Sequence, residues 1–261
     1  MAVFDKNKCT GCGSCVKDCV FGAIKLNEGK AEKEGQCILC GHCVAVCHKE
    51  AVSIPEYDMS DVEPFNKELY SFDIDNLLHT IKFRRSIRHF TEQPVERIKL
   101  ENIVQAGRYT ATGVNRQSCR FIVVQDKLKE LKAAIWNGID DILKNPDSVD
   151  EDAMKSVQHL DNMRAGGIDF LFRNAPATIY IAAESTVDAS LAAQNMELAA
   201  ISQGLGVLYN GYLVRMSSLI PEASSMLDLQ GKQIIINMLL GYPQLTYRRT
   251  APRKKADVVW R

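Results

Sequence analysis

The sequence predicts a two-part α+β protein, in which a small cysteine-rich module precedes a larger domain of mixed helices and strands. Eight of the nine cysteines lie between Cys9 and Cys47, and every arginine lies at position 84 or later. With 261 residues, the chain is long enough for a small module and a medium-sized domain. We therefore expect a module at residues 1–56, a connector at 57–74 and a larger domain at 75–261.

The N-terminal module contains an internal repeat. A shift of 28 positions carries the first four cysteines onto the last four, from Cys9 onto Cys37 through to Cys19 onto Cys47. The same shift aligns Gly13 with Gly41 and several apolar positions with one another. Because loop glycines and apolar residues repeat together with the cysteines, the pattern indicates a duplicated structural unit.

The spacing of the cysteines indicates iron-sulfur chemistry. In each repeat, three cysteines follow one another at intervals of three positions, and a fourth comes four positions later. Such a run supplies three thiolates to one 4Fe-4S cluster and sends the fourth to a second cluster. The expected metal ligands are Cys9, Cys12, Cys15 and Cys47 for one cluster, and Cys19, Cys37, Cys40 and Cys43 for the other.

Zinc is the alternative, because it also binds closely spaced cysteines, but zinc sites take four ligands and seldom use a third cysteine at this spacing twice. The module resembles the bacterial two-cluster ferredoxins. It departs from them at Val20 and His48, where that family usually has proline, and this departure affects the expected reduction potentials. Since eight cysteines saturate two clusters, we expect His42 and His48 to be solvated or hydrogen-bonded side chains.

Composition narrows the possible partners and the cellular compartment. Lysines and arginines number 32, as do aspartates and glutamates, so the net charge gives no reason to expect nucleic acid or an anionic membrane as a partner. The N-terminus lacks the pattern of a signal peptide, and no apolar run is long enough to span a membrane. Dense cysteines in a reducing compartment usually bind metal, so we expect a cytoplasmic protein.

The second part shows helix and strand patterns in mixed order. Short apolar runs predict buried strands, and the Ala- and Leu-rich run before Gly204 predicts a helix. The order favours an α+β domain over a regular doubly wound sheet. The expected helices cover residues 75–83, 94–108 and 189–203, and the expected strands cover 121–125, 177–183 and 234–240.

A dense basic segment, RRSIRHF at residues 84–90, follows the first expected helix. Three arginines and a serine within five positions suit an anion, although basic runs usually form solvated surfaces. From about residue 75 to the C-terminus, the chain resembles the nitroreductase family of FMN enzymes. The segments that carry this resemblance, in order, are RRSIRHF at 84, YTATGVNRQSCRFIV at 109, GVLYNGYL at 206 and LLGYPQLTYRRTAPRKKADVV at 239.

The nitroreductase resemblance implies a homodimer with FMN at the subunit interface. It places the FMN phosphate near the basic segment and the C-terminal tail, and a cation near the flavin pyrimidine, where negative charge collects on reduction. The residues that match cofactor-binding positions are Arg84, Arg85, Ser86, Arg88, Thr112, Gly113, Asn115, Gln117, Asn210, Gly211, Arg253 and Lys254. Ser118 and Cys119 depart from the Pro-Trp pair common there, and we expect Cys119 to be a buried structural cysteine.

Together the two parts predict an oxidoreductase that passes electrons from two 4Fe-4S clusters to FMN and on to a small electron-poor acceptor, such as a nitroaromatic or a quinone. No catalytic side chain is expected, because the cofactor carries the chemistry. The electron donor is reduced ferredoxin or NAD(P)H, and no dedicated dinucleotide motif is present. The alternative is a redox relay or sensor that exchanges electrons with a protein partner.

Overall fold

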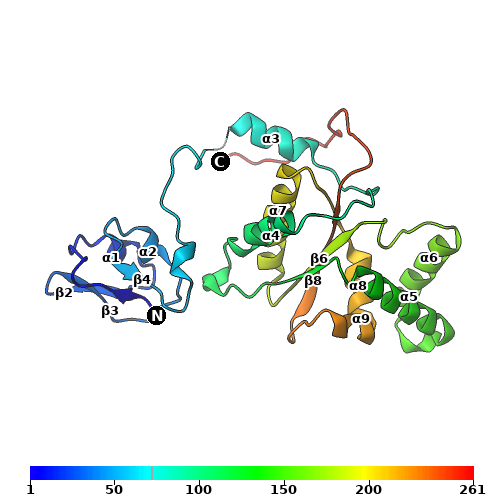
Figure 1. Ribbon diagram of the computed structural model, residues 1–261, viewed down its shortest axis with the longest axis horizontal. Helices are drawn as coiled ribbons and strands as arrows, with labels where there is room; N and C mark the ends of the chain where they lie inside the picture. Colours follow the sequence, from blue (N-terminus) through cyan, green and yellow to red (C-terminus); the bar gives the residue numbers. More distant parts are fainter. Residues whose placement is uncertain (72) are drawn as a thin grey trace. The chain divides into compact units, whose positions relative to one another are not determined.

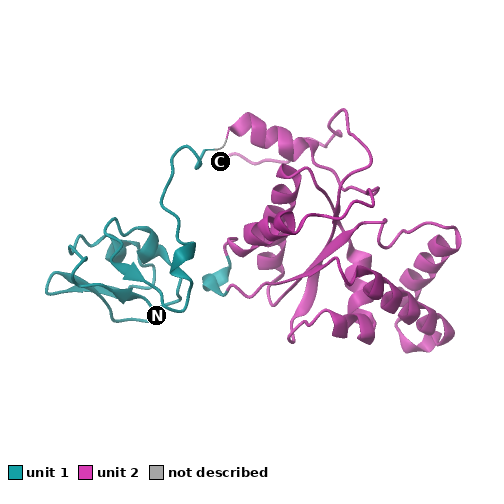
Figure 2. Cartoon of the chain, viewed as in Figure 1, with its two compact units in different colours: residues 1–72, 112–116 teal, residues 73–111, 117–261 magenta. Residues whose placement is uncertain are grey.

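The computed structural model describes residues 1–71 and 73–261, and the chain divides into two compact units. The first unit comprises residues 1–72 together with 112–116, and the second comprises 73–111 and 117–261 (Figure 2). Phe72, which belongs to the expected connector, lies outside the described residues. The boundaries expected at residues 56 and 74 stay predictions.

The first unit is built from very short elements around its cysteines (Figure 1). Two antiparallel strand pairs, β1 with β4 and β2 with β3, accompany two helices of five and four residues, α1 and α2. Their bounds are β1 Val3–Phe4, α1 Ser14–Asp18, β2 Ile24–Asn27, β3 Lys30–Lys33, α2 His42–Ala45 and β4 Val52–Ser53, followed by the 3₁₀ turn η1 Met59–Asp61.

Glycines in the left-handed backbone conformation shape the loops that carry the cysteines. Gly13 and Gly41 precede α1 and α2 with φ of 78° and 76°. Gly11 has φ of 71°, and a Cβ at that position would lie 2.1 Å from the carbonyl oxygen of Gly29. Only glycine fits such a position without strain. The sequence repeat is therefore also a repeat of backbone conformation.

The second unit contains a four-stranded antiparallel sheet with strand order β5-β6-β8-β7. All seven residues of β6 are buried, because helices cover both faces of the sheet. The strands are β5 Arg120–Val124, β6 Ala177–Ala183, β7 Gly206–Tyr209 and β8 Gln233–Gly241.

Two hydrophobic clusters fill the space on the two sides of this sheet. Helices α4 and α7 lie on one side of the sheet (Figure 1). On the other side α8 contacts β8, α5 and α9 pack with α8, and α6 packs on α5. The helices of this unit are α3 Ile74–Phe83, α4 Arg97–Arg108, α5 Leu128–Lys144, α6 Glu151–Ala165, α7 Thr186–Ser202, α8 Gly211–Leu219 and α9 Pro221–Met226, with 3₁₀ turns η2 Gly113–Asn115 in the first unit and η3 Pro146–Ser148 in the second.

The expected α+β class is confirmed, and so are the three strands and three helices predicted from the sequence, apart from their ends. The largest differences are at the starts of two helices: α4 begins at Arg97 and not at Pro94, and α7 begins at Thr186 and not at Ala189. The amide of Val95 donates to the side chain of Gln125 at 3.0 Å, and that side chain donates back to the carbonyl of Val95 at 3.0 Å. This reciprocal pair holds Val95 outside the helix.

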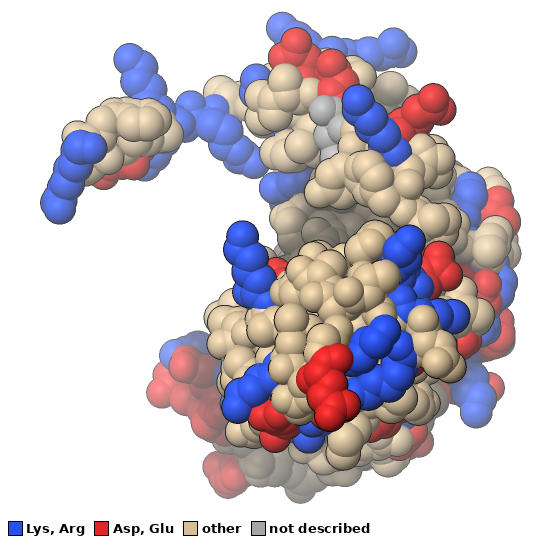
Figure 3. All heavy atoms as spheres, turned by 90° about the vertical axis from the view of Figure 1, so that its left-hand side faces the viewer, with Lys and Arg blue, Asp and Glu red and all other residues tan. Residues whose placement is uncertain are grey.

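The surface mixes both signs of charge. On the face shown in Figure 3, lysines and arginines are interspersed with aspartates and glutamates. Within residues 1–71 and 73–261, every helix is too short or too polar to cross a bilayer.

Close packing of Gly206 against the basic segment gives a first prediction. A Cβ on Gly206 would lie 2.4 Å from Cγ1 and 2.9 Å from Cβ of Ile87. Gly206→Ala should therefore lower the free energy of unfolding by about 1–3 kcal/mol, measured by urea denaturation followed by circular dichroism. Gly166→Ala is the control, because its nearest neighbour is 3.5 Å away, and it should change stability by less than about 0.5 kcal/mol. Equal effects of both variants would contradict this packing.

Candidate functional site

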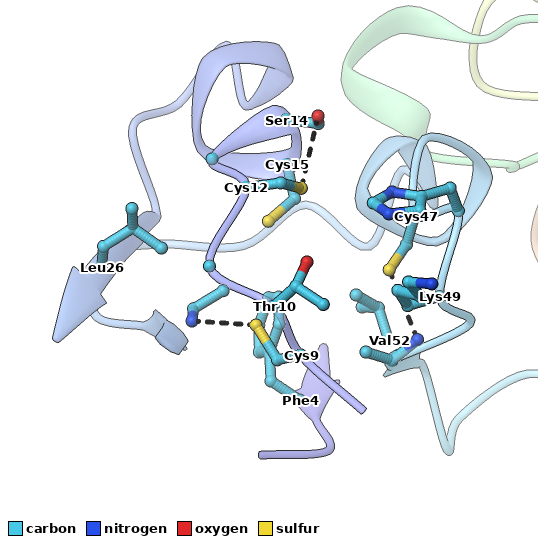
Figure 4. Close-up of a pocket in the computed structure, with 15 residues that line it drawn as sticks. Phe4, Cys9, Thr10, Cys12, Ser14, Cys15, Leu26, Cys47, Lys49 and Val52 are labelled. Atoms are coloured by element: carbon cyan, nitrogen blue, oxygen red, sulfur yellow. Dashed lines mark hydrogen bonds between the residues drawn. The ribbon is translucent and has the colours of Figure 1, made fainter. Parts of the chain in front are cut away.

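The eight N-terminal cysteines line two separate cavities in the first unit. The first cavity has a volume of about 370 Å³, open mouth included, and is lined by Cys9, Cys12, Cys15 and Cys47 (Figure 4). The second has a volume of about 450 Å³ by the same measure and is lined by Cys19, Cys37, Cys40 and Cys43. These are the two groups of four into which the spacing divides the cysteines, and each combines three cysteines of one repeat with one of the other.

Backbone amides point at several of the sulfur atoms. The amides of Ala31 and Ala51 donate to the sulfurs of Cys9 and Cys47, each at 3.3 Å (Figure 4). In the second cavity, the amide of Ala23 donates to Cys19 at 3.3 Å and the amide of Leu39 donates to Cys37 at 3.4 Å. Such donors stabilise thiolates, which are the form that binds iron.

The thiol pKa values follow these contacts and the depth of burial. The Ala31 amide is the main reason that the pKa of Cys9 lies below its usual value, and the Ser14 hydroxyl does the same for the pKa of Cys12. Burial raises the pKa of Cys15, and it raises the pKa of Cys43 to about 11. Iron binding to the two buried cysteines therefore has to drive the release of their protons.

The donor set fits iron-sulfur clusters. Each cavity offers four soft sulfur ligands, with apolar residues and amide donors around them. Among the residues that the structure describes, no three His, Cys, Asp or Glu side chains converge tightly enough to form a site for a single metal ion. The Nδ1 of His42 lies 3.1 Å from Oδ2 of Asp18, which agrees with the hydrogen-bonded side chain expected there.

In the second unit, the basic segment 84–90 runs between β7 and the residues that follow β8. The amide of Ile87 donates to the carbonyl of Val207 at 2.9 Å, and Phe90 forms a bridge with Pro243. Backbone contacts thus fix the segment at its middle and at its C-terminal end. The side chains of Arg84, Arg85, Ser86 and Arg88 are only partly buried or exposed.

Arg84 has a buried counter-charge that the sequence analysis missed. Its Nη1 lies 3.4 Å from Oε1 of Glu197, a carboxylate on α7 that is 2% exposed. The hydroxyl of Tyr209 is 3.4 Å from the other oxygen of that carboxylate, and burial raises the pKa of Tyr209. The sequence does contain a sign of this ion pair. Glu197 is the single glutamate in an Ala- and Leu-rich helix, and a charged side chain on a buried helix needs a partner of opposite charge.

The neighbouring Arg85 has a different environment. Its Nη1 donates to the carbonyl of Arg84 at 2.6 Å, whereas its Nη2 is buried with no hydrogen-bond partner. A buried guanidinium nitrogen can take water or, with a stronger bond, an anionic group as its partner. The segment therefore fits the phosphate-binding role that the resemblance implies for Arg85.

Arg173 is a second residue that the sequence analysis missed. Its guanidinium carbon lies 4.1 Å from the ring centre of Phe170, and its Nε is buried without a partner. Desolvation lowers the pKa of Arg173, and the charge of Arg88 adds to this effect. Arg173 therefore adds positive charge near Arg88, beyond the charge of the basic segment itself.

The expected flavin-contacting loop divides between the two units. Thr112, Gly113 and Asn115 group with the first unit, and Gln117 groups with the second. Within the first unit, the side-chain amide of Asn115 donates to the carbonyls of Ile38 and Leu39 at 3.2 and 2.9 Å. This bond to the loop between Cys37 and Cys40 was not foreseen, because a sequence gives no sign of which distant carbonyl an asparagine will reach.

Asn210 and Gly211 lie at the start of α8. The Asn210 side chain accepts from the amide of Leu213 at 3.0 Å and donates to the carbonyl of Leu171 at 2.6 Å. The side chain of Asn210 thus caps the helix, while Gly211 is exposed with open space around it. Its exposed backbone leaves room for a ligand ring to approach.

The structure does not bring Arg253 and Lys254 into the basic segment by any direct bond. Both are exposed on a tail without helix or strand.

Cys119 is half-buried against the core beside α7, and burial raises its pKa. That environment agrees with the structural role expected for Cys119.

Comparison with known proteins identifies both parts of the chain. Residues 8–52 match the family described as 4Fe-4S dicluster domain, and residues 81–242 match the nitroreductase family. The second match covers more than half of the chain, which therefore belongs to the nitroreductase family. The expected resemblances to two-cluster ferredoxins and to nitroreductases are confirmed.

Individual relatives agree with this assignment. The chain is 30% identical over 146 residues to "FMN reductase (NADPH)" of Bacillus subtilis, covering 53% of this chain and 55% of that protein. It thus spans about half the length of this relative. The N-terminal part is 43% identical over 47 residues to a component of the ion-translocating oxidoreductase complex of Methanosarcina acetivorans, covering 18% of each. A nitroreductase structure from Desulfitobacterium hafniense has a TM-score of 0.56 and 28% identity, covering 70% of this chain and 97% of that one.

The division of the cysteines into two ligand sets gives a second prediction. Cys12→Ala removes one ligand from the first cavity, and Cys40→Ala removes one from the second. Each variant should lose iron from one cluster only, out of about eight iron atoms in the intact chain. Iron and sulfide analysis measures this loss, and Cys119→Ala should retain the full iron content. Loss of iron in Cys119→Ala, or its full retention in both other variants, would contradict the division.

Proposed function

We propose that this protein is an iron-sulfur flavoprotein oxidoreductase, which passes electrons from its two 4Fe-4S clusters to FMN and on to a small electron-poor acceptor. Nitroaromatics and quinones are the acceptor classes we expect. The observation that carries the proposal is the presence, in one chain, of two cavities lined by four cysteines each and of a nitroreductase-family domain.

The FMN part of the proposal is supported by a relative and by the basic segment. The Desulfitobacterium hafniense nitroreductase, 28% identical to this chain, is described with bound FMN. In this chain, Arg85 keeps a buried guanidinium nitrogen available for an anion. We assign the FMN phosphate to Arg84, Arg85 and Ser86, with Arg253 and Lys254 from the tail, and the flavin ring to Arg88, Thr112, Gly113, Asn115, Gln117, Asn210 and Gly211.

FMN supplies the conversion between single electrons and electron pairs. The side chains hold the cofactor and shape its electrostatics: Arg88 and Arg173 provide positive charge where negative charge gathers on reduction. Glu197 neutralises Arg84 and keeps that guanidinium in place. We assign no catalytic acid, base or nucleophile to a side chain.

The donor and the assembly are part of the same proposal. We propose reduced ferredoxin or NAD(P)H as donor, and NADPH is the nucleotide in the name of the Bacillus subtilis relative. We further propose a homodimer in the cytoplasm, where a reducing environment keeps cysteines available for iron.

Anaerobic stopped-flow absorbance tests the function directly. The cluster- and FMN-loaded protein is mixed with reduced ferredoxin, NADH or NADPH, and then with a nitroaromatic or a quinone. The clusters should be reduced before the flavin when ferredoxin is the donor, and the acceptor should reoxidise both over repeated cycles. If the flavin is reduced but no small acceptor gives turnover, the proposed activity is wrong and a relay between protein partners replaces it.

Arg85 gives a third prediction. Arg85→Gln removes the positive charge proposed to bind the FMN phosphate, so the dissociation constant of FMN should rise about tenfold or more, equivalent to about 1.4 kcal/mol. Fluorescence quenching of FMN on titration with FMN-free protein measures it. The matched control is Arg97→Gln, because Arg97 on α4 has an 85% exposed side chain. Equal FMN affinity in both variants would contradict the assignment.

A further inference from the structure

The two cluster cavities differ at positions that the repeat makes equivalent. Ser14 and His42 correspond under the shift of 28 positions, and each follows a left-handed glycine. The Ser14 hydroxyl is 3.5 Å from the sulfur of Cys12, which donates to it as a thiol (Figure 4). Once Cys12 loses its proton to bind iron, the same hydroxyl is placed to donate to the sulfur. His42 instead pairs with the carboxylate of Asp18 at 3.1 Å. The first cavity thus has a hydroxyl donor where the second has a histidine held by an acid.

Backbone amides reach sulfur in both cavities, for example from Ala31 in the first and from Ala23 in the second. The cavities also differ in fixed charge. The ammonium of Lys30 donates to the carbonyl of Cys9 at 2.6 Å, which holds a positive charge beside a ligand of the first cluster. Each cavity also has one lining lysine, Lys49 in the first and Lys33 in the second. Lys30 is therefore an additional cation at the first cavity.

The second cavity has its own distinguishing feature, which is a more apolar wall. Val20, Phe21 and Ile38 line it, together with the acid-paired His42. Reduction adds one negative charge to a 4Fe-4S cluster. Hydrogen bonds to sulfur and nearby cations stabilise that charge, whereas apolar surroundings and a nearby carboxylate oppose it. All these differences act in the same direction.

We propose that the two clusters have unequal reduction potentials, that the cluster of the first cavity has the higher potential, and that Lys30 and Ser14 set much of the difference. One electron delivered to the pair by a one-electron reductant then resides on the first cluster. The acceptor of the enzyme plays no part in this inference, which requires only that both clusters are present.

The test is a dithionite titration of the cluster- and FMN-loaded protein, with the clusters followed by electron paramagnetic resonance. Two separate one-electron steps are expected, with the first cluster holding the electron at least about ten times as often as the second when the pair carries one electron. This ratio corresponds to about 59 mV between the steps. A single step with no separation would overturn the proposal.

Substitutions near each cavity show which cluster gives which reduction step. Lys30→Met and Ser14→Ala should each lower the higher potential and leave the lower one unchanged, and Lys30→Arg should restore the value of the unaltered protein. Lys33→Met, at the wall of the second cavity, should lower only the lower potential. Iron and sulfide content shows that both clusters are still present in each variant. If Lys30→Met shifts the lower step, or shifts both steps equally, the assignment of the two potentials is wrong.

Because no acceptor is added, this titration can fail without affecting the stopped-flow result. Equal potentials with normal turnover would refute only the inequality of the clusters. Unequal potentials without turnover would support it and refute the proposed activity.

Discussion

Each cluster requires four thiolates to converge on one cavity, and the two repeats of the first unit meet this requirement only together. Cys47 of the second repeat completes the first cavity, and Cys19 of the first repeat completes the second. The strands and helices here have two to five residues, which is too few to be stable in isolation. Cross-ligation by the clusters therefore ties the repeats together, and cluster binding and folding are coupled in this unit.

The second unit obtains its stability in another way, from hydrophobic packing on both faces of a four-stranded sheet. The basic segment beside β7 contributes Ile87 and Phe90 to that core, while its arginines are only partly buried or exposed. Two neighbouring arginines of this segment differ in their partners. Glu197 neutralises Arg84, whereas Arg85 keeps a buried nitrogen without a partner. This inequality makes Arg85 the better phosphate-binding candidate.

Much of this architecture is visible in the sequence. The spacing of the cysteines predicts the two groups of four, and the run 177–183 predicts β6, because a strand buried on both faces needs apolar residues throughout. The contacts between distant positions are not visible. Gln125 shortens α4 by pairing with Val95, and Glu197 reaches Arg84 across 113 positions of the chain. The FMN-binding residues stay predictions, because the sequence supports them only through resemblance.

The central claim is that one chain stores electrons in two iron-sulfur clusters and one flavin. An anaerobic coulometric titration, in which the electrons taken up per chain are counted against iron and FMN content, tests it most directly. The account predicts about four electrons per chain, one for each cluster and two for FMN. An uptake of about two electrons by protein with full iron and FMN content would show that one kind of centre does not participate in redox chemistry, and would contradict the account.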